Sequence, residues 1–221
     1  MNVVISNELL RLCPNYNVAV IVADITNTVY NAKLWEEIEL ISQNYRNKYN
    51  TESIKIIPAI YETREAYKRC GKEPSRYRPA AEALCRRIVK GDSLYKVNTV
   101  VDLINAVSIA TGFSIGGFDA DKIVGDTITY GIGRANEPYE GIGRGVLNIE
   151  GLPVWRDLVG GFGTPTSDNE RTKLSLNTSH LLVTINSYGA QSESELKKAA
   201  DYMLELLRKY ANASNVYSAI Y

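Results

Sequence analysis

Histidine, cysteine and long apolar runs are scarce in this chain of 221 residues, and each shortage excludes a class of protein. The single histidine, His180, excludes a site with several histidine ligands, and no group of cysteines, histidines and carboxylates has the spacing of a metal site. Cys13, Cys70 and Cys85 lie too far apart for a C-x-x-C pair, and their odd number suits reduced thiols in a cytosol. We therefore expect no metal ion and no cofactor.

The chain also lacks an apolar run of the roughly 18 to 20 residues that would span a bilayer. No basic segment precedes the short apolar stretch near the N-terminus, which argues against a signal peptide. These two absences predict a cytoplasmic protein without membrane contact. The 25 basic and 25 acidic residues cancel, which argues against bulk electrostatic attraction to nucleic acid and leaves room only for a local basic face.

The apolar pattern predicts an α+β protein in which helices flank mixed sheets, and we expect one compact domain over residues 1–221. Strands are expected at residues 18–23, 54–60 (cut by Pro58), 126–134, 152–156, 172–176 and 181–186. Helices are expected at residues 32–48, 62–70, 79–90 and 100–111. A last helix follows a capping box of Ser192 and Glu195, with an apolar stripe from Leu196 to Tyr210.

Residues 100–125, VVDLINAVSIATGFSIGGFDADKIVG, carry the most specific signal in the chain. The first half has helical periodicity up to Gly112, a helix C′ glycine, and the second half reads as a glycine-rich loop that closes on Phe118 and Asp119. This order resembles the editing module of the phenylalanyl-tRNA synthetase β subunit, its third and fourth domains. There a V-D-x-x-N-x-V helix runs into a loop ending F-D-x-D-K-I. Residues 159–172, VGGFGTPTSDNERT, are similar to a second loop of that module, and the resemblance covers about residues 60–190.

The resemblance implies a mixed-sheet α/β sandwich with a pocket between two lobes, where the synthetase removes tyrosine wrongly attached to its tRNA. A phenylalanine pocket rejects an analogue with one added hydroxyl by only on the order of 100-fold, so a second site is needed. Hydrolysis of the activated ester can proceed with positioned water and oxyanion donors, each worth about 100- to 1000-fold, without a nucleophilic side chain. We expect the segments 111–119 and 160–168 to face one such pocket.

Two positions depart from the family pattern. The synthetase carries a histidine where this chain has Gly116, and the acidic residue of its D-G-x-E turn aligns with Gly145. The tyrosine-reading and water-orienting groups of the synthetase therefore do not carry over. Either this chain hydrolyses a different aminoacyl ester with other groups, or it binds without catalysis.

The matched segments supply the candidate site residues. We expect Asn105 and Thr166 to act in catalysis, by binding the ester or orienting its water. The substrate-binding residues expected are Gly116, Gly161, Phe162, Thr164, Ser167 and Asp168. The alternatives are that the polar turn merely caps the strand after it and that Asn105 caps a neighbouring loop. His180 lies outside both segments, ahead of an apolar strand, so we expect a structural or surface role for it.

Residues 64–96 contain ten basic and four acidic side chains, with three tyrosines interleaved. This combination suits an RNA end, because phosphates pair with arginine and bases stack on aromatic rings. We expect RNA contacts at Arg76, Arg78, Arg86 and Arg87, with a solvated helix face as the alternative. The glycine-rich residues 131–145 do not fit the G-x-G-x-x-G template of nucleotide-binding loops and predict turns between strands instead.

The sequence thus predicts a tRNA-editing module that binds the 3′ end of aminoacyl-tRNA and hydrolyses a mischarged ester in trans. Nothing in the chain resembles an aminoacylation domain, so a complete ligase is excluded. Two alternatives remain: a non-catalytic protein that binds tRNA or a free amino acid, and an enzyme acting on a small amino-acid-like metabolite.

Overall fold

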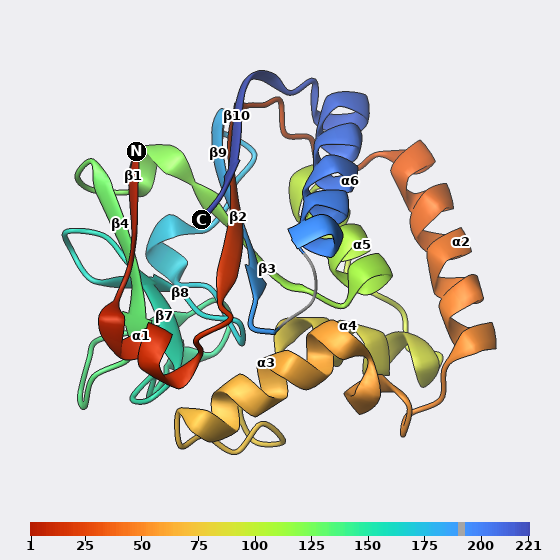
Figure 1. The fold of residues 1–221 in the computed structure, drawn as a ribbon. Coiled ribbons are helices and arrows are strands. Elements are labelled where there is room, and N and C mark those ends of the chain that lie inside the picture. Colours follow the sequence, from red (N-terminus) through yellow and green to blue (C-terminus); the bar gives the residue numbers. More distant parts are fainter. Residues whose placement is uncertain (190–192) are drawn as a thin grey trace.

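The computed structural model describes residues 1–189 and 193–221, which form two packed sheets with helices beside them (Figure 1). The larger sheet is antiparallel and has the strand order β10-β2-β9-β3. The second four-stranded sheet, which we call the smaller sheet because its strands are shorter, has the order β1-β4-β7-β8; β1 and β4 run parallel and the other pairs antiparallel. Strands β5 and β6 form a separate two-stranded hairpin. The predicted α+β class with mixed sheets is confirmed.

Four α-helices follow one another in the first half of the chain, and a run of strands follows them. The strands are β1 (Asn2–Ile5), β2 (Asn17–Asp24), β3 (Ser114–Asp119), β4 (Thr127–Ile132), β5 (Glu140–Gly141), β6 (Gly145–Val146), β7 (Pro153–Arg156), β8 (Gly161–Gly163), β9 (His180–Ser187) and β10 (Ser214–Ile220). The α-helices are α1 (Asn7–Leu12), α2 (Ala32–Lys48), α3 (Pro58–Arg69), α4 (Ala80–Val89), α5 (Thr99–Thr111) and α6 (Glu193–Ala211). Short 3₁₀ turns lie at Ile54–Ile56, Ala120–Lys122 and Glu170–Thr172.

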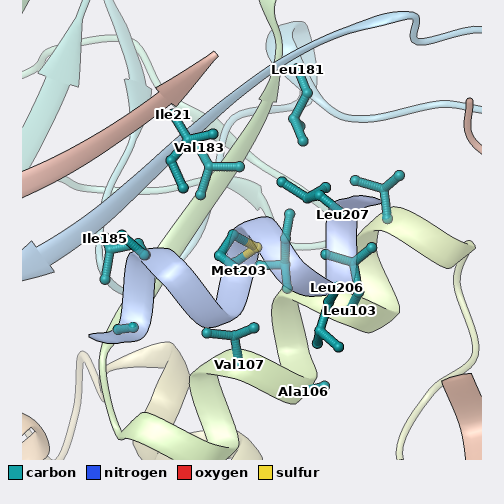
Figure 2. Packing of buried hydrophobic residues seen from close by; sticks show 14 of the residues in the cluster. Ile21, Leu103, Ala106, Val107, Leu181, Val183, Ile185, Met203, Leu206 and Leu207 are labelled. Carbon is teal, nitrogen blue, oxygen red and sulfur yellow. The ribbon is translucent and has the colours of Figure 1, made fainter. Parts of the chain in front are cut away.

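Helices α5 and α6 cover one face of the larger sheet (Figure 1). Because side chains alternate along a strand, Ile21 of β2 and Val183 of β9 point to these helices, whereas their neighbours point to the other face. Figure 2 shows Met203 of α6 between this sheet face and Val107 of α5. Burying each such side chain contributes about 1.5–3 kcal/mol, which fixes α5 against the sheet.

The opposite face of the larger sheet packs against the smaller sheet. Val20 and Phe118 from the first sheet meet Tyr130, Trp155 and Phe162 from the second, and all five side chains are buried. The rings of Phe118 and Phe162 meet edge to face, with centroids 4.8 Å apart. This interface brings β3 and β8, the two segments expected to face one pocket, into contact.

Helices α2, α4, α5 and α6 and several strands lie where the apolar pattern predicted them, α3 begins earlier than expected, and α1 was not predicted. Helix α2 has the expected bounds, and α5 ends at Gly112, whose φ of +79° a side chain would disfavour. The stripe of α6 from Leu196 to Tyr210 is buried. Ser192 of the expected capping box lies outside the described residues.

Three expectations about local structure are wrong. Residues 54–60 form a 3₁₀ turn and the start of α3 rather than a strand, because Pro58 occupies the first helical turn, where its missing N–H costs nothing. Residues 172–176 form no strand; the Asn169 side chain caps a 3₁₀ turn that ends at Thr172. The glycine-rich loop after Gly112 is strand β3, paired with β9 from Ser114 to Asp119.

Candidate functional site

A cavity of about 250 Å³ lies where the loop before α4, the β5–β6 hairpin and the turn after β8 meet. We call it the turn pocket. It is lined by Arg76, Tyr77, Arg144, Val146, Leu147, Asn148, Ile149, Leu152, Thr164 and Thr166. Its wall is therefore partly aliphatic, its polar groups include two arginines and two threonines, and its lining contains no carboxylate, histidine or cysteine.

The hydroxyl group of Thr166 makes two hydrogen bonds that hold this residue at the turn pocket. Its Oγ1 lies 2.8 Å from the hydroxyl of Tyr67 in α3 and donates to the carbonyl oxygen of Tyr77. Burial raises the pKa of Tyr67 far above its usual value, so this phenol stays protonated and donates to Thr166. Since the single Thr166 hydroxyl proton goes to Tyr77, its Oγ1 can only accept from a ligand.

The polar turn that contains Thr166 is fixed by its own hydrogen bonds. Thr164 Oγ1 accepts from the backbone N–H groups of Thr166 at 3.3 Å and Ser167 at 3.1 Å. The Pro165 carbonyl accepts from the N–H of Ala80 at the start of α4, and the hydroxyl of Tyr139 donates to the Ser167 carbonyl at 2.7 Å. The turn thus joins α4 to the β5–β6 hairpin, a role beyond capping a strand.

Asp168 ends the turn on the side that faces β3. Its buried carboxyl group lies 3.4 Å from the N–H of Gly117, and burial raises its pKa to about 8. The segments 111–119 and 160–168 therefore touch, whereas the expectation was that they face a common pocket. The turn pocket opens on the other side of the turn, however, and no residue of 111–119 lines it.

The ring of Phe118 fills the space between the two segments. A Cβ atom added at Gly116 or at Gly163 would lie 2.4 Å from Phe118 Cζ, so the ring occupies the space beside both glycines. Gly116 is thus buried against Phe118, and Phe162 is a core residue; neither lines the turn pocket. The Phe118 ring thus takes the space that a side chain at position 116 would need.

Asn105 lies on another side of α5. It shares a helix face with Asp102, which accepts a hydrogen bond of 2.8 Å from Trp35 of α2, and with Ile109, which packs against α4. Asn105 is half-buried and does not line the turn pocket. The structure does not bring the two expected catalytic residues, Asn105 and Thr166, to one cavity.

A second cavity of about 350 Å³ lies across the β5–β6 hairpin and shares Val146 with the turn pocket. Gly160, Gly161 and Arg171 contribute to its lining. Arg171 binds both carboxylate oxygens of Asp157 at 2.9 Å. The glycine-rich hairpin thus borders both cavities, and its Arg144 is a site residue that the sequence pattern did not single out.

The four arginines expected to bind RNA occupy three places. Arg76 lines the turn pocket, with its guanidinium 5.7 Å from the ring centre of Tyr77. Arg87 stacks on the exposed ring of Tyr95 at 4.2 Å. Arg78 and Arg86 both approach Glu82.

Glu82 is the centre of a cluster of three arginines, and its side chain is only 1% exposed. Arg64 Nη1 lies 2.7 Å and Arg86 Nε 2.8 Å from its carboxylate, and Arg78 Nε lies 3.8 Å away. We call Arg64, Arg78, Glu82 and Arg86 the Glu82 cluster. Three guanidinium groups around one carboxylate leave a net charge of +2, which favours an additional anion.

His180 lies on the surface, as expected, with its Nδ1 2.8 Å from the Asp121 carboxylate. In the part of the chain that the structure describes, no three His, Cys, Asp or Glu side chains gather as a metal site would require. None of the helices described over residues 1–189 and 193–221 is long and apolar enough to cross a membrane.

Comparison with known proteins connects this fold to one family. Residues 62–212 match the family model described as the B3/4 domain. The structure is similar to an N-terminal fragment of the phenylalanyl-tRNA synthetase β subunit from Pyrococcus horikoshii, with a TM-score of 0.51 and 15% sequence identity. The similarity covers 99% of this chain and 53% of that one, so this chain spans about half the length of the solved fragment. No curated protein matches the chain.

Proposed function

Because the chain belongs to the B3/4 domain family, we propose that it is a tRNA-binding module of the phenylalanyl-tRNA synthetase β-subunit type that hydrolyses a mischarged aminoacyl-tRNA in trans. The observation that carries the proposal is the pair of arginines at the turn pocket. Arg76 and Arg144 line one small cavity with Thr164 and Thr166. Within the described residues, neither guanidinium has a hydrogen-bond or ion-pair partner on the protein, so both are available to a ligand.

The arrangement suits the 3′ end of an aminoacyl-tRNA. Phosphates pair with Arg76, Arg144 and the Glu82 cluster, and Tyr77 offers a ring for a base. The aliphatic wall formed by Leu147 and Leu152 contacts the amino-acid side chain. Thr166 Oγ1, which can only accept, receives a hydrogen bond from the ammonium group of the ester.

Hydrolysis in this arrangement needs no nucleophilic side chain. A water oxygen adds to the ester carbonyl carbon, the bond to the ribose oxygen breaks, and that oxygen takes up a proton. Hydrogen-bond donors of the pocket stabilise the negative charge that develops on the carbonyl oxygen, an effect of about 100- to 1000-fold for one well-placed donor. Asn105 stays a predicted catalytic residue that does not line the cavity, and Asp168, with its raised pKa, lies behind the turn.

A non-catalytic binding protein is the second candidate. It is favoured by the lining of the turn pocket, which contains no carboxylate, histidine or cysteine to take up a proton from water. Such a protein holds tRNA or a free amino acid with the same contacts. The third candidate, an enzyme on a small amino-acid-like metabolite, would use the cavity without the basic surface.

The decisive experiment is deacylation of a panel of mischarged tRNAs, with spontaneous ester loss as the control. We expect the chain to accelerate loss of at least one amino acid. Salt-sensitive tRNA binding without any deacylation would support the binding protein, and absence of salt-sensitive binding would overturn the tRNA role.

Arginine variants test the assigned surface. Arg76→Ala and Arg144→Ala should each weaken tRNA binding roughly tenfold and lower the salt slope by about 1, because each removes one phosphate contact. Arg208→Ala on the exposed side of α6 is the matched control and should leave binding unchanged. Equal effects of all three variants would contradict the location of the site.

A further inference from the structure

Two of the three cysteines form a pair that the proposed tRNA role does not use. Cys13 follows the last residue of α1, and Cys70 follows the last residue of α3. The fold brings these helix ends together: Cys70 packs against the apolar cluster that contains Cys13, and Arg69, the residue before Cys70, contacts the Cys13 sulfur. Cys85 of α4 packs in a separate apolar cluster with Ile54 and Ile88.

The guanidinium group of Arg69 lies beside Cys13. Arg69 Nη2 donates to Cys13 Sγ at 3.8 Å, and among the described residues Arg69 makes no ion pair with a carboxylate. The neighbouring Cys70 thiol and the Arg69 guanidinium lower the pKa of Cys13 to about 7, against the opposing effect of burial. The other titratable groups that act on the pair are Glu8 and the buried phenols of Tyr16, Tyr67 and Tyr130.

The two cysteines differ in their access to solvent. Cys13 is fully buried, whereas Cys70 is half-buried. A surface cavity of about 410 Å³ is lined by Pro14 and Arg69, the chain neighbours of the two cysteines. The pair therefore lies close to the surface, and Cys70 is its partly exposed member.

We propose that Cys13 and Cys70 are a thiol-modification site, at which an oxidant of the peroxide class converts the pair into a disulfide. The Cys13 thiolate attacks one peroxide oxygen, the O–O bond breaks, and the departing hydroxide takes up a proton to become water. Cys13 is then a sulfenic acid. The Cys70 sulfur attacks the Cys13 sulfur, the S–O bond breaks, and the departing hydroxide leaves with the Cys70 proton as a second water. The two thiols lose two electrons, which reduce one peroxide to two waters.

The modification connects two parts of the fold. Cys13 ends the helix that packs beside β4, and Cys70 ends the helix whose Tyr67 holds Thr166 at the turn pocket. A covalent bond between them joins the smaller sheet to α3. The inference does not depend on the proposed tRNA role, because its test counts thiols.

The test treats the folded protein with hydrogen peroxide and counts free thiols after denaturation. We expect the count to fall from three to one, with Cys13 and Cys70 in one disulfide-linked peptide pair and full recovery with a reductant. Cys85→Ser is the control and should form the same link. Only intermolecular disulfides, a link that includes Cys85, or three thiols retained would overturn the proposal.

Two variants separate the roles of the pair. Cys70→Ser should leave Cys13 as a sulfenic acid that a small dimedone-type probe captures. Arg69→Gln keeps both thiols and should slow oxidation at pH 7 roughly tenfold, with the difference vanishing above about pH 9, because fewer Cys13 thiols are ionised at neutral pH. Equal rates in Arg69→Gln and the parent protein at pH 7 would contradict the part assigned to Arg69.

Discussion

At the scale of single residues, Asp168 shows how burial and position decide chemistry. The residue was expected in the substrate site, and the structure places its carboxyl group against the backbone of β3. Burial raises its pKa to about 8, whereas an unfolded chain has an aspartate pKa of about 3.9. Between these pH values the folded protein holds a proton that the unfolded chain has released.

The stability of the protein should therefore fall as pH rises through this window. The contribution of Asp168 is fully present below about pH 4 and is lost by about pH 8, at up to about 1.4 kcal/mol per pH unit. Asp168→Asn should remove this slope, because its amide oxygen can accept from Gly117 without a charge. Urea denaturation of both proteins between pH 5 and 8 measures the difference; parallel pH profiles would contradict it.

His180, unlike Asp168, is exposed, and its pKa is also raised. Its hydrogen bond to Asp121 and the charge of Asp121, with a smaller effect of Asp24, raise the pKa above the usual value. This contribution to stability is present below about pH 6.5 and is lost as pH rises through the folded pKa.

An NMR titration of the His180 ring should show the raised pKa, and Asp121→Asn should return it toward the usual value. His180→Ala should leave tRNA binding and any deacylation unchanged, because the ring lies on the surface and outside the turn pocket. A loss of turnover in folded His180→Ala protein would show that the site lies elsewhere.

At the scale of elements, β3 depends on glycines that leave room for large side chains. Gly116 makes room for the Phe118 ring, and Gly117 makes room for Ile104, whose Cδ1 would lie 2.4 Å from an added Cβ. Strand β3 can pack between α5 and the smaller sheet because these two residues have no side chain.

Gly116→Ala should therefore destabilise the protein by about 1–3 kcal/mol, the usual cost of overpacking a core. Phe118→Leu, which trims the ring, should make the added effect of Gly116→Ala smaller than in the parent chain. A double-mutant cycle measured by urea denaturation gives this coupling. Additive effects of the two substitutions would show that the ring moves away freely.

The elements that the sequence predicted well are those with a strong local period. The 3.6-residue apolar repeat defined α2 and α6, and the continuous apolar run defined β2. Strand β3 was read as a loop because Gly116 and Gly117 have low strand propensity, and its pairing with β9 depends on residues far away in the chain. In the candidate site, the polar turn was expected from its motif, whereas Arg144 lines the turn pocket only because the tertiary fold brings it there.

At the scale of the whole molecule, the larger sheet is shared by two apolar cores. One face carries α5 and α6, and the other carries the smaller sheet. Strand β2 contributes Ile21 to one core and Val20 to the other, so that neither core persists without it. This arrangement favours one cooperative unit over two separable lobes.

The two tryptophans test this expectation, because Trp35 lies on α2 and Trp155 lies between the sheets. In Trp35→Phe protein, the fluorescence of Trp155 reports on the sheet interface, and far-ultraviolet circular dichroism reports mainly on the helices. We expect both signals to change at the same urea concentration. Two separate midpoints would show two lobes that unfold independently.

The contact of Phe118 with Gly116 and Gly163 also constrains the order in which this family could change. A histidine at position 116 has no room while the Phe118 ring lies there, so a mutation that introduces it first would be selected against through loss of stability. A lineage that acquires a large side chain at position 116 must replace the aromatic ring before or together with the glycine. The two positions are therefore coupled by epistasis, and sequences that combine Phe118 with a large residue at position 116 or 163 should be rare among natural variants.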